Sequence, residues 1–210
     1  IVGYVVYKRE HIKEHPMIHH VRERIRFCEL FSNMRLYWRT KELWSVFGVA
    51  LGVNWWWAVS AIYFPIYILN AGYSEFVVGL VVAGGMFPLL VMEQYIGVQA
   101  DKRGLRGFIG SGFLFIALVT VLFDIIPLVS VVLFLMAAVN IGMAFVEPLQ
   151  ETYLYKVIKM RDENRLFGVY NMSEPLANIV APFVCAMLIL FGGMTALWYG
   201  TAIIMALFAY

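Results

Sequence analysis

Three carboxylic acids lie inside long apolar runs of this sequence, at Glu93, Glu147 and Glu174. An ionised carboxylate at the centre of a bilayer costs on the order of 3 kcal/mol, so an acid in such a run is expected to have a function. Burial generally raises the pKa of a carboxyl group toward neutrality, where it can take up and release a proton. We interpret Glu174, and after it Glu147 and Glu93, as proton-coupling candidates. Interhelical hydrogen bonding, or an ion pair with Lys156 or Arg165, is the structural alternative.

Asparagines accompany two of these acids at helical spacing. Asn171 and Asn178 flank Glu174, and Asn140 lies seven residues before Glu147. Each set occupies one helical face, and two such faces opposite one another predict a hydrated path.

A third polar face, carrying an amide and an indole, begins eleven residues into the first long apolar run. Asn54 and Trp57 share this face. Aromatic side chains line many ligand cavities, but tryptophan is also a common interfacial anchor, so both interpretations stay open. The substrate-cavity candidates are therefore Asn54, Trp57, Asn140, Asn171 and Asn178.

A short polar sequence interrupts the apolar runs between residues 97 and 106. Gly97, Asp101, Lys102, Gly104 and Arg106 follow the pattern Gly, three residues, Asp, basic, any residue, Gly, any residue, basic. The aspartate can accept backbone N–H groups or pair with a base, and the arginine can reach a carboxylate on a neighbouring helix. Such contacts hold one conformation closed and break in another. An ordinary solvated loop is the structural alternative.

The composition identifies the elements that must position these residues. Apolar residues make up 62% of the chain and charged residues only 14%, against roughly 25% charged in a soluble domain. The mean hydropathy is +0.77. These values predict an all-α membrane protein and argue against soluble enzymes and nucleic-acid-binding modules. The cysteines and histidines have no spacing that completes a metal site, and no cofactor is expected.

Six apolar runs are each long enough to cross a bilayer as a helix. They cover residues 43–69, 75–98, 107–124, 127–149, 166–190 and 194–210. All 16 lysines and arginines lie within residues 8–41, 102–106 and 156–165. The positive-inside rule therefore predicts that these segments are cytosolic and that the protein is a multi-pass protein of the cytoplasmic (inner) membrane.

The residues before the first run divide into two parts. Residues 1–7 are interpreted as the end of a truncated transmembrane helix, and residues 8–42 as a basic cytosolic linker. Ile18, Val21, Ile25 and Cys28 recur at spacings of three and four, which predicts an amphipathic helix in the linker. Residues 43–210 form the predicted six-transmembrane-helix bundle, and similarly placed prolines in its first and fourth runs suggest a 3+3 inverted repeat.

The loop at residues 97–106 resembles the cytosolic loop motif of the major facilitator superfamily. Gly107 stands where the strongest versions have a second basic residue, so this loop is similar to the copy in the second half of such transporters. The resemblance implies the C-terminal six-helix half of a secondary transporter that works by alternating access, with the missing N-terminal half, membrane lipids, a small-molecule substrate and a coupling ion as partners. The proton is the expected ion. The gate residues would be Gly97, Asp101, Lys102, Gly104, Arg106 and Glu147.

Other classes remain to be compared with this interpretation. A self-contained six-helix channel or carrier, or a non-transporting membrane sensor of the same fold, has the same composition. An intramembrane serine hydrolase needs a histidine base, but every histidine precedes residue 21, so the chain is not expected to be an enzyme. Substrate identity and transport direction are not determined by these residues.

Overall fold

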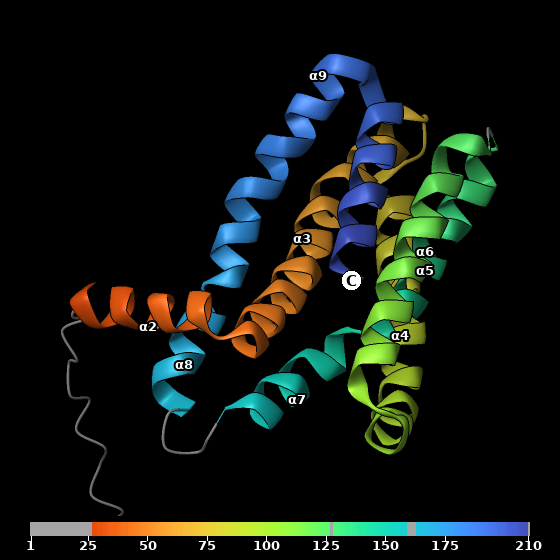
Figure 1. Ribbon diagram of the computed structural model, residues 1–210. Coiled ribbons are helices and arrows are strands. Elements are labelled where there is room, and N and C mark those ends of the chain that lie inside the picture. The colour runs from red at the N-terminus through yellow and green to blue at the C-terminus, as the bar shows by residue number, and fades with distance from the viewer. Residues whose placement is uncertain (1–26, 127, 159–162, 210) are drawn as a thin grey trace, which may run out of the picture.

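The computed structural model describes residues 27–126, 128–158 and 163–209, and all regular structure within them is helical (Figure 1). The predicted stub at residues 1–7 and most of the predicted amphipathic helix lie outside these residues. The helices are α2 (Phe27–Arg39), α3 (Lys41–Asn70), α4 (Glu75–Arg103), α5 (Leu105–Ile125), α6 (Val129–Ala144), α7 (Glu147–Val157), α8 (Glu163–Tyr170) and α9 (Ser173–Phe208).

Five helical stretches of the described chain are long and apolar enough to cross a membrane. They are Lys41–Asn70, Glu75–Arg103, Leu105–Ile125, Val129–Val157 and Leu166–Phe208. The last stretch holds both the fifth and the sixth predicted span, because α9 reverses direction within its length (Figure 1). The reversal is at Gly192 and Gly193, and Gly193 has a φ of 66°, a backbone conformation that favours glycine.

Two of the predicted spans are interrupted by prolines. Proline lacks an N–H group, and its ring clashes with the carbonyl group four residues earlier. Four residues before Pro148 is Ala144, where α6 ends, and four residues before Pro175 is Asn171, in the turn between α8 and α9. The continuous helices expected across residues 127–149 and 166–190 are therefore broken. Three other prolines lie inside helices without ending them: Pro65, Pro88 and Pro182.

The bundle is arranged around α5, which packs against both α6 and α9, while α3 packs on α9 and α4 on α6. Small residues bring α5 and α6 together, since a Cβ atom added at Gly112 would lie 2.8 Å from the carbonyl oxygen of Gly142. On the other side of α5, aromatic rings form the core. Trp198 lies with ring centroids 5.2 Å from Phe123 and 6.2 Å from Phe64, joining α9, α5 and α3.

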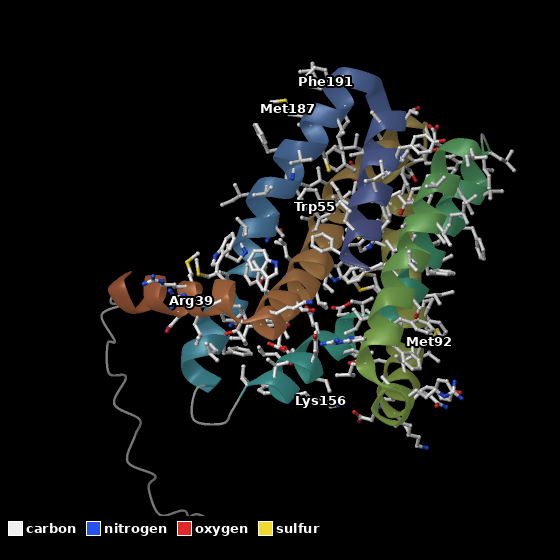
Figure 2. The ribbon with its side chains drawn as sticks, in the orientation of Figure 1. Arg39, Trp55, Met92, Lys156, Met187 and Phe191 are labelled. Carbon is white, nitrogen blue, oxygen red and sulfur yellow. The ribbon has the colours of Figure 1, made fainter. Side chains whose placement is uncertain are left out.

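One end of the bundle carries the polar elements. Figure 1 shows α2, α7, α8 and the α4–α5 turn at this end, and the reversal of α9 at the other. The basic side chains labelled in Figure 2, Arg39 and Lys156, lie at the same end. The hydroxyl group of Tyr37 donates a hydrogen bond to the carbonyl oxygen of Leu166 at 2.9 Å, which ties α2 to α8.

Candidate functional site

An aromatic cavity of about 160 Å³ lies between α3, α4 and α6. Its wall includes Trp57 and Phe64 of α3, Met86 of α4, and Met136 and Asn140 of α6. The lining is almost wholly apolar, with the amide of Asn140 as one of its few polar groups. Apolar walls with a few polar groups are typical of small-molecule sites, because the polar groups fix the orientation of the ligand.

A second, acidic cavity of about 290 Å³ lies between α4 and α7. Its lining contains Glu93 of α4 and Glu147, Gln150 and Glu151 of α7. No lysine or arginine lines it, and within the described side chains none of its three carboxylates makes an ion pair. The break between α6 and α7 produces this arrangement, because it makes Glu147 the first residue of α7.

Trp57 and Glu147 connect the two cavities. The Trp57 side chain, which lines the aromatic cavity, lies close to the carboxyl group of Glu147, which lines the acidic cavity. The Glu147 residue as a whole is partly buried, and its Oε2 atom is fully buried and has no hydrogen-bond partner. The Oε1 atom of Gln150 is also buried and has no partner. A buried acceptor without a donor costs about 1–3 kcal/mol, so a proton, water or ligand donor that reaches these oxygens is stabilised.

The predicted proton-coupling residues occupy different surroundings. Glu93 is exposed at the rim of the acidic cavity, opposite Glu147. Glu174 is exposed in the first turn of α9 and lines neither cavity. Because α9 packs mainly against α3 and α5, the polar faces around Glu174 and Glu147 are not on helices packed directly together.

The predicted substrate-cavity residues also occupy different surroundings. Trp57 and Asn140 come together in the aromatic cavity. Asn54 instead donates hydrogen bonds to the carbonyl oxygen of Ala50 at 2.9 Å and to the hydroxyl oxygen of Ser173 at 3.0 Å, which joins α3 to α9. Asn171 lies in the turn before α9, and Asn178 is exposed on α9.

The predicted gate sequence forms the turn between α4 and α5. Gly97, Asp101 and Lys102 belong to the last turns of α4, and Gly104 has a φ of 98° between the helices. Arg106 lies in the first turn of α5. The positive φ of Gly104 explains why a glycine is needed there.

The aspartate of this turn has a partner on another helix. The Nζ atom of Lys156, near the end of α7, lies 2.9 Å from Oδ1 of Asp101. Among the described residues Arg106 makes no ion pair, and Glu147 faces the acidic cavity instead. The sequence indicated that Asp101 could pair with a base, and Lys156 belongs to one of the basic segments, but spacing alone does not select it.

A polar contact at the opposite end was not anticipated. The hydroxyl group of Thr195, just after the reversal of α9, donates a hydrogen bond to Oδ1 of Asp124 at 2.7 Å. The only signal in the sequence is an acid at the end of an apolar run with no basic residue near it.

These features define a multi-pass helical membrane protein with cavities between its spanning helices. The family model of the Major Facilitator Superfamily matches residues 34–210, so the chain belongs to that superfamily, whose members are transporters rather than enzymes. The predicted resemblance and the predicted helical half-bundle are thereby confirmed. Comparison with curated proteins and with solved structures gives no match.

Proposed function

We propose that this chain is one six-helix half of a secondary active transporter that moves a small solute across the membrane by alternating access. The observation that carries the proposal is the placement of Trp57, which lines the aromatic cavity, close to Glu147, a carboxylate inside a membrane-spanning stretch. A solute in the aromatic cavity and a proton on Glu147 would then act on the same pair of side chains. Coupling between two ligands requires that each changes the binding of the other.

Glu147 is the proposed proton carrier. Its charged form is disfavoured inside a membrane, and its partnerless Oε2 atom offers a position for the proton. A neighbouring carboxylate, Glu93, adds like-charge repulsion that disfavours ionisation of both groups together. Glu174 stays a candidate from the sequence, and the experiment below compares it with Glu147 directly.

The ion pair between Asp101 and Lys156 is the proposed gate contact. It joins α4 to α7 at the end where the basic segments lie, which we assign to the cytosol from the positive-inside rule. Alternating access requires contacts that form in one state and break in the other. The large exposed apolar side chains along α4 and the first part of α9 would meet lipid and a second six-helix half.

The test is proton movement in proteoliposomes that contain the full-length protein and a pH-sensitive dye in the lumen. Sugars, amino acids, organic cations and organic anions are added separately, and the solute that moves protons identifies the substrate class. Glu147→Gln should abolish solute-driven proton movement, while exchange of labelled for unlabelled solute continues, because neutral glutamine resembles the protonated state.

Glu174→Gln and Glu93→Gln serve as matched variants. Normal coupling in Glu147→Gln together with lost coupling in Glu174→Gln would move the proton site to α9. Binding of a solute without any transport, in the parent protein, would favour the sensor alternative. Transport without saturation would favour a channel.

A further inference from the structure

The exposed side of α2 combines basic and amphipathic side chains. Arg35 and Arg39 are four residues apart, so they lie on one helical face, and both are exposed. Leu36 and Trp38 flank this pair, with 40% and 70% of their surface exposed. A helix with basic residues between apolar ones is typical of the membrane interface, where apolar groups enter the headgroup region and basic groups meet phosphate.

The opposite side of α2 is held against the protein. Tyr37 is 2% exposed, and its hydroxyl group donates the hydrogen bond to the Leu166 carbonyl oxygen of α8. Burial raises the pKa of Tyr37 to about 12, so the hydroxyl group remains a donor throughout the neutral range. This contact fixes the rotation of α2 about its axis and keeps Arg35 and Arg39 on the outside.

An aromatic row continues from α2 onto the first membrane-spanning stretch. The ring centroids of Trp38 and Trp44 are 4.6 Å apart, and Trp44 lies 6.0 Å from Phe47. Trp44 is 45% exposed and lies in the first turns of α3. Tryptophan is enriched at the boundary between lipid and water, so this row places α2 at the level of the headgroups.

The net charge of this surface is positive. Residues 35–44 contain the basic residues Arg35, Arg39 and Lys41 and a single acid, Glu42. Within the described side chains, none of these three basic groups forms an ion pair. Arginine binds phosphate oxygens through two parallel hydrogen bonds, so the natural counter-charge at this level of a membrane is a lipid phosphate.

We propose that the exposed face of α2, formed by Arg35, Leu36, Trp38, Arg39 and Trp44, binds the headgroups of anionic phospholipids. Figure 1 shows α2 lying across the axis of α3, and only Thr40 separates the two helices. The short connection places the end of α2 next to the end of a membrane-spanning helix. The binding is independent of the proposed transport reaction.

The test uses tryptophan quenching by brominated lipid in vesicles that hold the full-length protein. The vesicles are phosphatidylcholine with either brominated phosphatidylglycerol or brominated phosphatidylcholine at equal fractions. The difference in quenched fluorescence between the parent protein and the Trp38→Phe variant gives the quenching of Trp38 alone. We expect the anionic brominated lipid to quench Trp38 more strongly than the zwitterionic one. Arg35→Gln or Arg39→Gln should each lower that preference about fivefold, since each basic residue near an anionic surface contributes about 1 kcal/mol.

Arg103→Gln is the matched control, because Arg103 is an exposed arginine at the same end of the bundle but on α4. It should leave the preference at Trp38 unchanged, and circular dichroism verifies that all variants keep their helicity. No quenching of Trp38 by either lipid would mean that protein covers this face and would overturn the proposal. Equal quenching by both lipids, or an equal loss in Arg103→Gln, would also overturn it, since neither outcome is specific to α2.

Discussion

At the scale of the residue, the ion pair between Asp101 and Lys156 has the weakness that the proposed gate requires. The two side chains are 64% and 50% exposed, so solvent screens their attraction, and such pairs contribute about 1 kcal/mol or less. A contact this weak does not hold a fold together. It is strong enough to shift the balance between two conformations of similar free energy by up to about fivefold.

Asp101→Asn and Lys156→Gln should each lower the solute turnover rate, by up to about fivefold, while leaving solute affinity nearly unchanged. The pair lies outside both cavities, so the substitutions alter only the balance of conformations. The measurement is initial transport rate against solute concentration. Exchanging the charges, with Asp101→Lys and Lys156→Asp together, should restore the parental rate. If the exchanged pair is as impaired as the single variants, the two residues do not act through each other.

At the scale of the element, the break between α6 and α7 determines the candidate site. Pro148 leaves the Ala144 carbonyl group without its intrahelical donor, and the chain turns at Phe145 and Val146 before α7 begins. The first residue after this turn is Glu147, whose carboxyl group then lies close to Trp57. A straight helix would carry the rest of α7 in another direction.

Pro148→Ala should therefore join α6 and α7 into a more continuous helix. The distance between spin labels on two exposed residues, Phe134 of α6 and Tyr155 of α7, should increase by several ångströms, because straightening extends the path at about 1.5 Å per residue. Pulsed electron paramagnetic resonance measures this distance between the two spin labels. Pro65→Ala, in a helix that its proline does not break, is the control for proline removal. An unchanged distance would show that the turn does not depend on Pro148.

The same elements show how far the sequence predicts the structure. Long apolar runs identify the spanning helices, since lipid leaves no other way to satisfy the backbone. They do not show which prolines interrupt a helix: Pro148 and Pro175 do, while Pro65 and Pro88 do not. Membrane-spanning helices tolerate proline when neighbouring groups satisfy the freed carbonyl, which only the packed structure reveals.

The candidate site was predictable to a similar degree. The sequence indicated Trp57 and Asn140 as cavity residues, and the structure brings them together. Asn54 was predicted on the face of Trp57, but its amide reaches Ser173 of α9. Whether Asn54 lines the cavity or packs between helices is decided by a partner that is distant in the sequence. The contact of Trp57 with Glu147 depends on the turn before α7, so spacing along a continuous helix does not reveal it.

At the scale of the whole molecule, Trp198 joins the two sides of the bundle. It is 1% exposed and contacts aromatic rings from α3 and α5. Trp198→Ala should lower the free energy of unfolding by about 3 kcal/mol, the lower limit for a buried aromatic residue. The lower limit applies because helices that separate within a membrane expose the ring to lipid rather than to water, so less hydrophobic free energy is lost. Thermal unfolding followed by size-exclusion chromatography gives the change. Phe191→Ala, at a side chain that is 85% exposed, should have little effect. Equal losses in both variants would mean that the ring cluster does not stabilise the bundle.

Helix α7 carries Glu147 at one end and Lys156 near the other, nine residues and about 14 Å apart. If this short helix moves as a stiff rod, it would link the acidic cavity to the Asp101 contact. A tilt that moves one end away from Trp57 also moves the other relative to α4. With the turn at Phe145 and Val146 as the pivot, a tilt would displace the Lys156 end most and would turn the Glu147 carboxyl group relative to Trp57, so the proposed proton site and the proposed gate contact would change together.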